Sequence, residues 1–253
     1  MKANYHTHSK WCHHGGGEIS DYIEEALKFG FEQLAITEHV PHLDRPTWIK
    51  EDEFLPFDAD LNRCVSLYSD RIRVIKGFEC EYINKTCVLD LYKRYKEDYG
   101  YELLIMGQHC AGDNGEHNMF FAKDSEVIKR YFEDVVEGLH TGLFAYLAHP
   151  DVCLIDYEPG FDKVCEEGFK MVFQACEELK IPVEYNANGL RNHKVYPSKE
   201  VFELSKNYDL TYMIGSDAHD PSLLCDWAVE ESEKILKDMN IEVTEILPAG
   251  LIP

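Results

Sequence analysis

Residues 33–39 read Gln-Leu-Ala-Ile-Thr-Glu-His, a short apolar run that ends on two polar side chains. A run of this length and composition is typical of a buried β-strand. The same design recurs along the whole chain, and each run is followed by residues with ionisable or amide side chains. The predicted strands cover residues 3–7, 33–37, 72–78, 103–106, 143–148, 182–185 and 211–214.

Longer amphipathic stretches separate these runs and predict helices. Alternating strands and helices favour a parallel sheet joined by crossover helices. A length of 253 residues is ordinary for one β/α barrel, which takes about 250. We therefore predict an α/β fold in which residues 1–253 form a single (β/α)7 barrel. The predicted helices cover 21–29, with Ser20 as the cap, and 125–140, 162–179, 198–207 and 226–239.

Composition limits the functions open to this barrel. The formal net charge is −22, which repels the phosphate backbone of nucleic acids. No apolar run is long enough to cross a membrane, and residues 1–6 do not resemble a signal peptide. Nine scattered cysteines without a Cys-x-x-Cys pair indicate neither a disulfide framework nor a zinc ribbon. We expect a cytoplasmic protein without nucleic-acid or membrane partners, whose oligomeric state the sequence does not indicate.

The residues that follow the predicted strands are nearly all of types that bind metals. In a β/α barrel the carboxyl ends of the strands converge on one face, and that face carries the active site. Residues far apart in the sequence would therefore meet there. In strand order they are His6 and His8, Glu38 and His39, Glu79, Gln108 and His109, His149, Asn186, and Asp217 and His219.

The spacing of these residues supports a metal site. His6 and His8 lie two residues apart, which puts both imidazoles on one side of a strand, and Asp217 and His219 repeat that spacing. His14 adjoins a glycine-rich turn. Each residue alone also has an ordinary explanation, such as a hydrogen-bonded histidine or a helix cap. Together, imidazoles and carboxylates without thiolates favour zinc, manganese or iron. Metal ions would also supply the local positive charge that an acidic protein needs to bind an anion.

Several motifs resemble the PHP (polymerase and histidinol phosphatase) superfamily, in family order along nearly the whole chain. Residues 8–15 and 184–198 are similar to its histidinol-phosphatase branch. Two motifs depart from the common pattern: Glu38 stands where aspartate is usual, and Gln108 precedes the histidine of the fourth motif. The motifs are His6-x-His8, His14-Gly15, Thr37-Glu38-His39, Gly77-Phe78-Glu79, His109, Ala148-His149-Pro150 and Gly215-Ser216-Asp217-Ala218-His219.

The resemblance implies a distorted seven-stranded barrel that holds three divalent transition-metal ions. It implies that Glu79 bridges two of the ions and is catalytic, lying beside the hydroxide that attacks phosphorus. The first ion would be held by His6, His8, Glu79 and Asp217, the second by Glu79, His109 and His149, and the third by His14, His39 and His219.

Two further residues are expected to act on the substrate. Arg191 would bind the phosphoryl oxygens through its guanidinium fork; the alternative is a surface arginine at a helix end. His42 resembles a family position that contacts phosphate, and it would protonate the leaving alkoxide.

The resemblance implies that the substrate is L-histidinol phosphate, a small phosphorylated metabolite of histidine biosynthesis. Loop acids could bind its amine, with Asp44, Asp113 and Glu116 as the candidates. Two alternatives stay open from the sequence: a phosphoesterase of the same type acting on nucleotides or nucleic-acid ends, and a metal-binding domain without catalytic activity.

Overall fold

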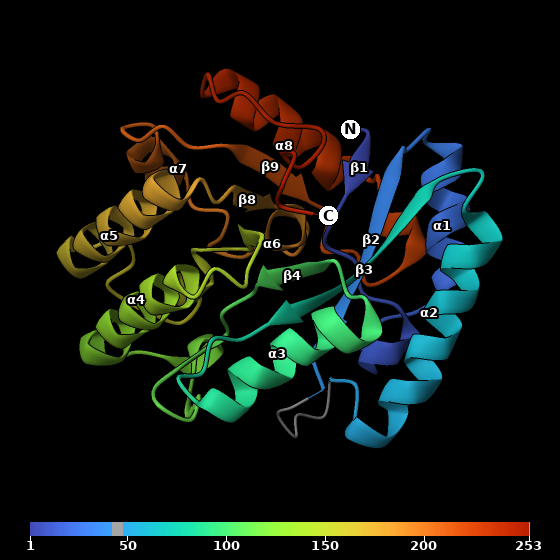
Figure 1. Ribbon diagram of the computed structural model, residues 1–253. Helices are drawn as coiled ribbons and strands as arrows, with labels where there is room; N and C mark the ends of the chain where they lie inside the picture. Colours follow the sequence, from blue (N-terminus) through green and yellow to red (C-terminus); the bar gives the residue numbers. More distant parts are fainter. Residues whose placement is uncertain (42–47, 253) are drawn as a thin grey trace.

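A computed structural model of the chain describes residues 1–41 and 48–252. Its main sheet has seven strands in the order β1-β2-β3-β4-β7-β8-β9, and all neighbouring strands are parallel (Figure 1). This confirms the strands expected from the apolar runs. The strands are β1 (Ala3–Asn4), β2 (Gln33–His39), β3 (Arg73–Cys80), β4 (Leu103–Met106), β7 (Tyr146–Leu147), β8 (Val183–Asn186) and β9 (Tyr212–Gly215).

The sheet curves until its two edge strands approach each other. Thr7 forms a parallel bridge with Ala218, and the backbone amide of His8 donates to the Ala218 carbonyl at 2.9 Å. The buried side chain of Asn4 adds a second link, because it donates to Thr7 and accepts from the amide of Ser216 at 2.9 Å. The fold is therefore a nearly closed barrel flanked by helices, as predicted.

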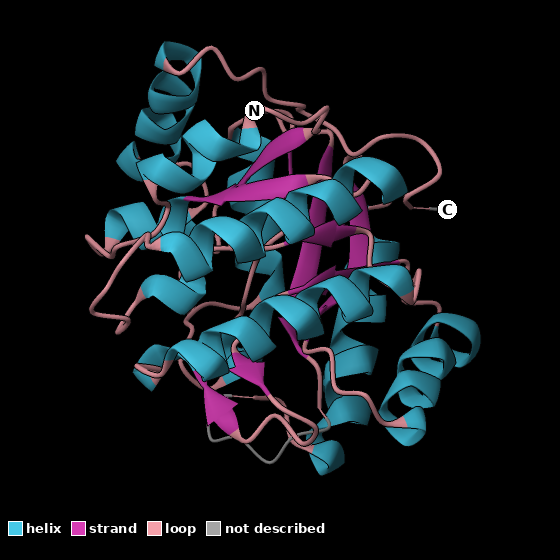
Figure 2. Ribbon diagram, turned by 90° about the vertical axis from the view of Figure 1, so that its left-hand side faces the viewer, coloured by secondary structure: helices cyan, strands magenta, loops and turns pink. Residues whose placement is uncertain are grey.

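Helices surround the sheet on its outer side (Figure 2). All five segments predicted as helical contain a helix, and α4 has the predicted bounds. The first is capped by Glu18 and not by Ser20: the Glu18 backbone carbonyl accepts from the Asp21 amide at 2.9 Å, and the Asp21 carboxylate accepts from the Glu18 amide at 2.8 Å. The helices are α1 (Ile19–Lys28), α2 (Phe54–Tyr68), α3 (Thr86–Tyr99), α4 (Ser125–His140), α5 (Lys163–Leu179), α6 (Ala187–Arg191), α7 (Lys199–Ser205) and α8 (Trp227–Asp238).

Sequence reasoning did not find α2, α3, the short α6 or a small hairpin. Helix α3 buries only Tyr92 and Tyr95, which is too few apolar positions to reveal a helical period. The hairpin pairs β5 (Cys110–Ala111) with β6 (His117–Asn118) in antiparallel fashion, and each strand has only two residues. Segments this short carry no readable periodicity.

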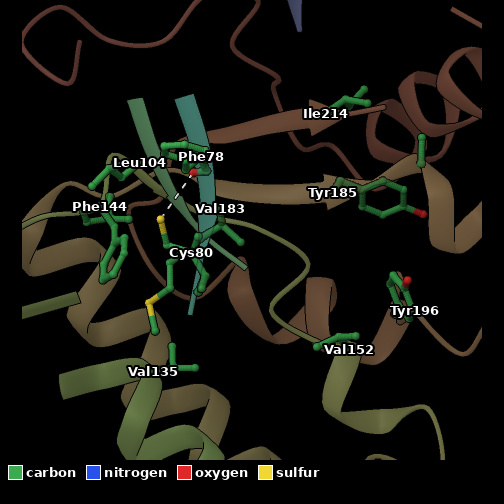
Figure 3. Packing of buried hydrophobic residues seen from close by; sticks show 14 of the residues in the cluster. Phe78, Cys80, Leu104, Val135, Phe144, Val152, Val183, Tyr185, Tyr196 and Ile214 are labelled. Carbon is green, nitrogen blue, oxygen red and sulfur yellow. Dashed lines mark hydrogen bonds between the residues drawn. The ribbon is translucent and has the colours of Figure 1, made fainter. Parts of the chain in front are cut away.

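Successive residues of the strands enter two separate apolar layers. Leu104 lies next to Phe78 in the outer layer, which also includes helix residues such as Val135 (Figure 3). Leu103 and Ile105 belong to a smaller cluster made without any residue of the helices, which lies inside the barrel. Alternation with period two explains this division, because both faces of the sheet are buried.

The inner apolar cluster closes one end of the barrel. Leu247, from the segment after α8, joins it, and the Leu247 amide donates to the Tyr5 hydroxyl at 3.0 Å. Along β3 the inward positions pass from Ile75 through Gly77 to Glu79, so the interior changes from apolar to ionisable toward the carboxyl ends. Apolar side chains therefore fill the barrel at the amino ends of the strands, which we call the apolar plug, and the carboxyl ends can hold a polar site.

In the part of the chain that the structure describes, no helix has both the length and the apolar character needed to cross a membrane.

Barrel closure should depend on Asn4. Replacing Asn4 by alanine leaves the buried Ser216 amide without its acceptor, so we expect Asn4→Ala to destabilise the fold by roughly 2–3 kcal/mol. Urea unfolding measures this change. Asn114→Ala, at an exposed position, is the matched control and should stay within about 0.5 kcal/mol of the native chain. Equal stabilities for the two variants would contradict this account of closure.

Candidate metal centre

The nine predicted metal ligands meet at the carboxyl ends of the strands. Seven of them line a cleft of about 550 Å³ between the loops that follow the strands. His6 and His8 are completely buried at its floor. The remaining predicted ligands all line the cleft: His14, His39, Glu79, His109, His149, Asp217 and His219.

The central group consists of two imidazoles and two carboxylates. Glu79 Oε2 lies 3.4 Å from His6 Nε2 and 3.3 Å from His8 Nε2. Asp217 Oδ1 lies 3.6 and 3.4 Å from the same two nitrogens. Two ligand atoms that share a tetrahedral zinc ion at about 2.0–2.1 Å are themselves about 3.4 Å apart. These four imidazole–carboxylate distances match a common ion, and the ligand atoms of His6, His8 and Glu79 all lie within 4.8 Å of one another.

The second predicted group also gathers around Glu79. Its other oxygen, Oε1, is hydrogen-bonded to His149 Nε2 at 2.7 Å, closer than two ligands of one zinc ion, and lies 3.6 Å from His109 Nε2. A single carboxylate thus faces both groups, one oxygen to each.

The third predicted group is less compact. His39 and His219 come together with His8, whereas His14 and His219 come together with Cys12, in sets whose ligand atoms lie within 4.8 Å of one another. Burial raises the pKa of the Cys12 thiol to about 12, so it packs as a neutral side chain. A single ion held by His14, His39 and His219 stays a prediction.

Several of the imidazole nitrogens fit a metal because they have no hydrogen-bond partner. In the described part of the chain, buried imidazole nitrogens without a hydrogen bond include His6 Nε2, His39 Nδ1, His149 Nδ1, His219 Nε2 and both ring nitrogens of His8. Buried polar atoms are nearly always paired, because an unpaired one costs about 1–3 kcal/mol. Cations placed among these nitrogens would satisfy them.

Protonation in the cluster is uneven. Burial, together with neighbouring histidines, lowers the pKa of His8 and His39, which keeps both imidazoles in the neutral form that metals bind. Burial would raise the pKa of Glu79, but His39 and His6 outweigh it and hold that pKa well below its usual range. For Asp217, too, burial would raise the pKa, but His6 and His219 outweigh burial and lower it. Both carboxylates are therefore ionised.

Two histidines behave in the opposite way. Burial alone would lower the pKa of His109, but Glu79 and Glu81 overcome it and raise that pKa to about 9. The pKa of His6 is also raised well above its usual value, because Glu184 and Asp217 overcome the effect of burial. In the metal-free protein both imidazoles therefore carry a proton at neutral pH.

A second layer of buried carboxylates orients the imidazoles, and sequence reasoning did not assign it this role. Glu184 Oε1 lies 2.8 Å from His6 Nδ1, and Glu81 Oε1 lies 3.0 Å from His109 Nδ1. Glu38 lies near His8 but does not bond it: its Oε2 is 3.9 Å from His8 Nδ1, and its Oε1 accepts from the Ser9 amide at 2.7 Å. All three glutamates are buried within or next to a strand. A charged residue inside an apolar strand was the available signal, since such residues are rarely buried without a partner.

Two glycines make room for these carboxylates. A Cβ atom at Gly107 would collide with the carboxylate of Glu79, and one at Gly215 would collide with that of Glu184. Both glycines lie at the end of a strand next to the one that carries the glutamate. The close approach of carboxylate to backbone thus requires glycine at both positions.

Arg191 lines the cleft, but its donors already have partners. Nε and Nη2 bond the two oxygens of Asp226 at 2.6 and 2.9 Å. The remaining donors reach Asn188 Oδ1 at 3.4 Å, the Ser216 carbonyl at 3.2 Å and the Leu223 carbonyl at 3.1 Å. A guanidinium has five N–H groups, and five bonds are formed. The predicted contact with phosphate would require one of them to break.

The other substrate-binding candidates lie elsewhere. His42 and Asp44 fall outside the described residues, and their roles stay predictions. Asp113 and Glu116 do not line the cleft: they border a separate hollow next to α4, where Asp113 pairs with Arg130 at 3.0 Å. The structure therefore does not place either candidate acid at the cleft, because both lie in the turn between β5 and β6.

Aromatic side chains form walls of the cleft that the sequence did not indicate. Trp48 stacks on His39 with ring centroids 5.1 Å apart, and Phe120 stacks on His109 at 5.6 Å. Tyr196 packs edge-on against His149 at 6.4 Å. These rings restrict water around the proposed ligands.

Orientation by the outer carboxylates should be measurable. Glu184→Gln removes the charge that fixes His6, so we expect zinc affinity to fall by roughly 10- to 100-fold. Competition with a chromophoric chelator measures this affinity. Glu167→Gln, on the exposed face of α5, is the matched control. A Glu184→Gln protein that bound zinc as tightly as the control would show that Glu184 has no orienting role.

Zinc binding should release protons. Metal ligation requires neutral imidazole, so His6 and His109 must lose protons that their raised pKa values hold, and affinity should rise from about pH 6.5 towards 9. Calorimetric titrations in two buffers of different ionisation enthalpy count the protons. His109→Asn should release fewer than the native chain, and His140→Asn, on the surface, the same number. Zinc binding without proton release near neutral pH would contradict these protonation states.

Comparison with known proteins agrees with this geometry. A family model described as the PHP domain matches residues 4–188. A histidinol-phosphatase of Bacillus subtilis is 24% identical, over 87% of this chain and 94% of its own length. A DNA polymerase/3'-5' exonuclease PolX of the same organism is 23% identical, over 89% of this chain but 35% of its own length. The crystal structure of a histidinol phosphate phosphatase from Lactococcus lactis, complexed with zinc, L-histidinol and phosphate, has a TM-score of 0.67 at 16% identity, covering 96% of this chain and 95% of that one.

Proposed function

Since this chain belongs to the PHP domain family, we propose that it is a metal-dependent phosphomonoesterase that hydrolyses L-histidinol phosphate to L-histidinol and phosphate. One observation carries the proposal: a cleft of small-molecule size ends on a floor of ionised carboxylates and unpaired imidazole nitrogens. The names of the relatives supply the choice of substrate.

We assign three divalent ions to the ligand sets implied by the sequence. His6, His8, Glu79 and Asp217 would hold the first, and their spacing supports it. Zinc is the metal we favour, since the Lactococcus lactis enzyme is complexed with it. Bound divalent ions lower the pKa of water and neutralise phosphoryl oxygens, which is the chemistry that hydrolysis of a phosphate monoester needs. The remaining ligand sets are Glu79, His109 and His149, and His14, His39 and His219.

The protein's own residues prepare the site for that chemistry. Glu79 is ionised and faces two ligand groups at once, so its position fixes the separation between them. Trp48 and Phe120 cover two of the imidazoles and exclude water from one side of each. We retain His42 as the proposed proton donor to the leaving alkoxide. A biosynthetic role for the reaction would place the protein in the cytoplasm.

Nucleic-acid ends are the competing substrate, because one relative is named as an exonuclease. The net charge of −22 opposes the approach of a polyanion of any length. A small monoester that carries its own cationic group suffers less from this repulsion. The charge therefore favours a zwitterionic metabolite.

A substrate panel tests the proposal. We expect the kcat/KM of the zinc-loaded protein for L-histidinol phosphate to exceed that for phosphoserine, nucleoside monophosphates, sugar phosphates and short single-stranded DNA by at least about tenfold, or roughly 1.4 kcal/mol of transition-state binding. A chelator should abolish activity towards every compound. If another compound leads, the substrate assignment is wrong, and if activity survives complete metal removal, so is the metal mechanism.

A further inference from the structure

The cleft has two basic side chains besides its histidines, in the part of the chain that the structure describes: Arg191 and Lys194. The N–H donors of Arg191 are all bonded to other groups of the protein. Its bidentate pair with Asp226 is nearly buried, at 9% and 11% exposure, and its other donors hold the backbone on either side of the loop that carries Asp217. Arg191 therefore ties α6 to α8 and to the end of β9.

Lys194 is in the opposite situation. Within residues 1–41 and 48–252, its ammonium group has neither a hydrogen bond nor an ion pair, although most basic side chains of this acidic protein have a carboxylate partner. Its side chain is exposed and lines the cleft. An unpaired ammonium with three donors is well suited to bind an anion that enters this opening.

The backbone around Lys194 is held in place. The Lys194 amide donates to the Gly189 carbonyl at 2.9 Å, which fixes the segment to α6. On the other side, Tyr196 is buried, and the Ser198 amide donates to the buried carboxylate of Asp151 at 2.6 Å. The backbone on both sides of Lys194 is thus anchored, so its exposed side chain can meet a ligand without rearrangement of the loop.

We propose that Lys194 is the side chain that binds an anionic oxygen of the phosphoryl group in the cleft, and that Arg191 is a positioning residue for the loop of Asp217. The inference rests on the proposed function, because it assumes a phosphorylated ligand. It reassigns the contact that the sequence predicted for Arg191. The proposed contact is a charge-assisted hydrogen bond from the flexible side chain of Lys194, and not a bidentate contact from the guanidinium of Arg191.

Affinity for inorganic phosphate tests the proposal without reference to any particular alcohol. Calorimetric titration of the zinc-loaded protein with phosphate should show roughly tenfold weaker binding for Lys194→Ala, the low end for a hydrogen bond to a charged group. Lys194→Arg keeps the charge and should retain most of the affinity. Lys199→Ala is the matched control, since Lys199 is exposed five positions along the chain but does not line the cleft. Zinc content is measured for every variant.

The two assignments give different signatures. Arg191→Lys should lower the Tm clearly, because it breaks the network with Asp226, whereas Lys194→Ala should leave the Tm unchanged. Phosphate affinity equal to that of the native chain in Lys194→Ala would overturn the proposal. So would an equal loss in Lys199→Ala, or an Arg191→Lys protein of unchanged Tm that no longer binds phosphate.

A wrong substrate assignment would give results different from a wrong assignment of Lys194. If another compound leads the substrate panel while phosphate binding still weakens in Lys194→Ala alone, the role of Lys194 stands and the histidinol phosphate assignment falls. If the zinc-loaded native chain binds no phosphate, both are wrong.

Discussion

The carboxylate of Glu79 is the group on which the rest of the site depends. Its two oxygens lie within 3.6 Å of imidazole nitrogens from five histidines, which come from four strands of the barrel and the loops after them. A buried carboxylate is tolerated only where positive charge or hydrogen bonds surround it. The five histidines meet that condition, and they reach it because parallel strands end on a common face. The histidines are His6, His8, His39, His109 and His149.

The buried charge of Glu79 determines which residues can surround the histidines. Imidazoles that face a carboxylate or a cation with one nitrogen need a partner for the other, and Glu184 and Glu81 supply it. The carboxylates need space between closely packed strands, which Gly107 and Gly215 leave. Ligands, orienting acids and glycines therefore form one unit, and a change in any of them disturbs the others.

The same arrangement reconciles an acidic protein with an anionic ligand. A net charge of −22 is spread over the surface, while the cleft gathers histidines, the proposed cations and an unpaired Lys194 in one place. The apolar plug at the other end of the barrel keeps these groups confined to the carboxyl ends of the strands. Electrostatic attraction then acts only where the chemistry takes place.

The sequence by itself determined where the strands lie, that they form a parallel sheet, and which polar residues follow them. Apolar runs and two-residue spacings such as His6-x-His8 are local patterns, so they can be recognised without the fold. Only the tertiary structure decided which partner each polar group takes. Glu184 meets His6 across 178 positions of the chain, and Arg191 meets Asp226 across 35. Such pairings depend on how strands and helices come together in space, and no local periodicity records them. For that reason the nine predicted ligands lie together at the carboxyl ends of the strands, whereas Asp113 and Glu116 lie away from the cleft and Arg191 is already bonded to the protein.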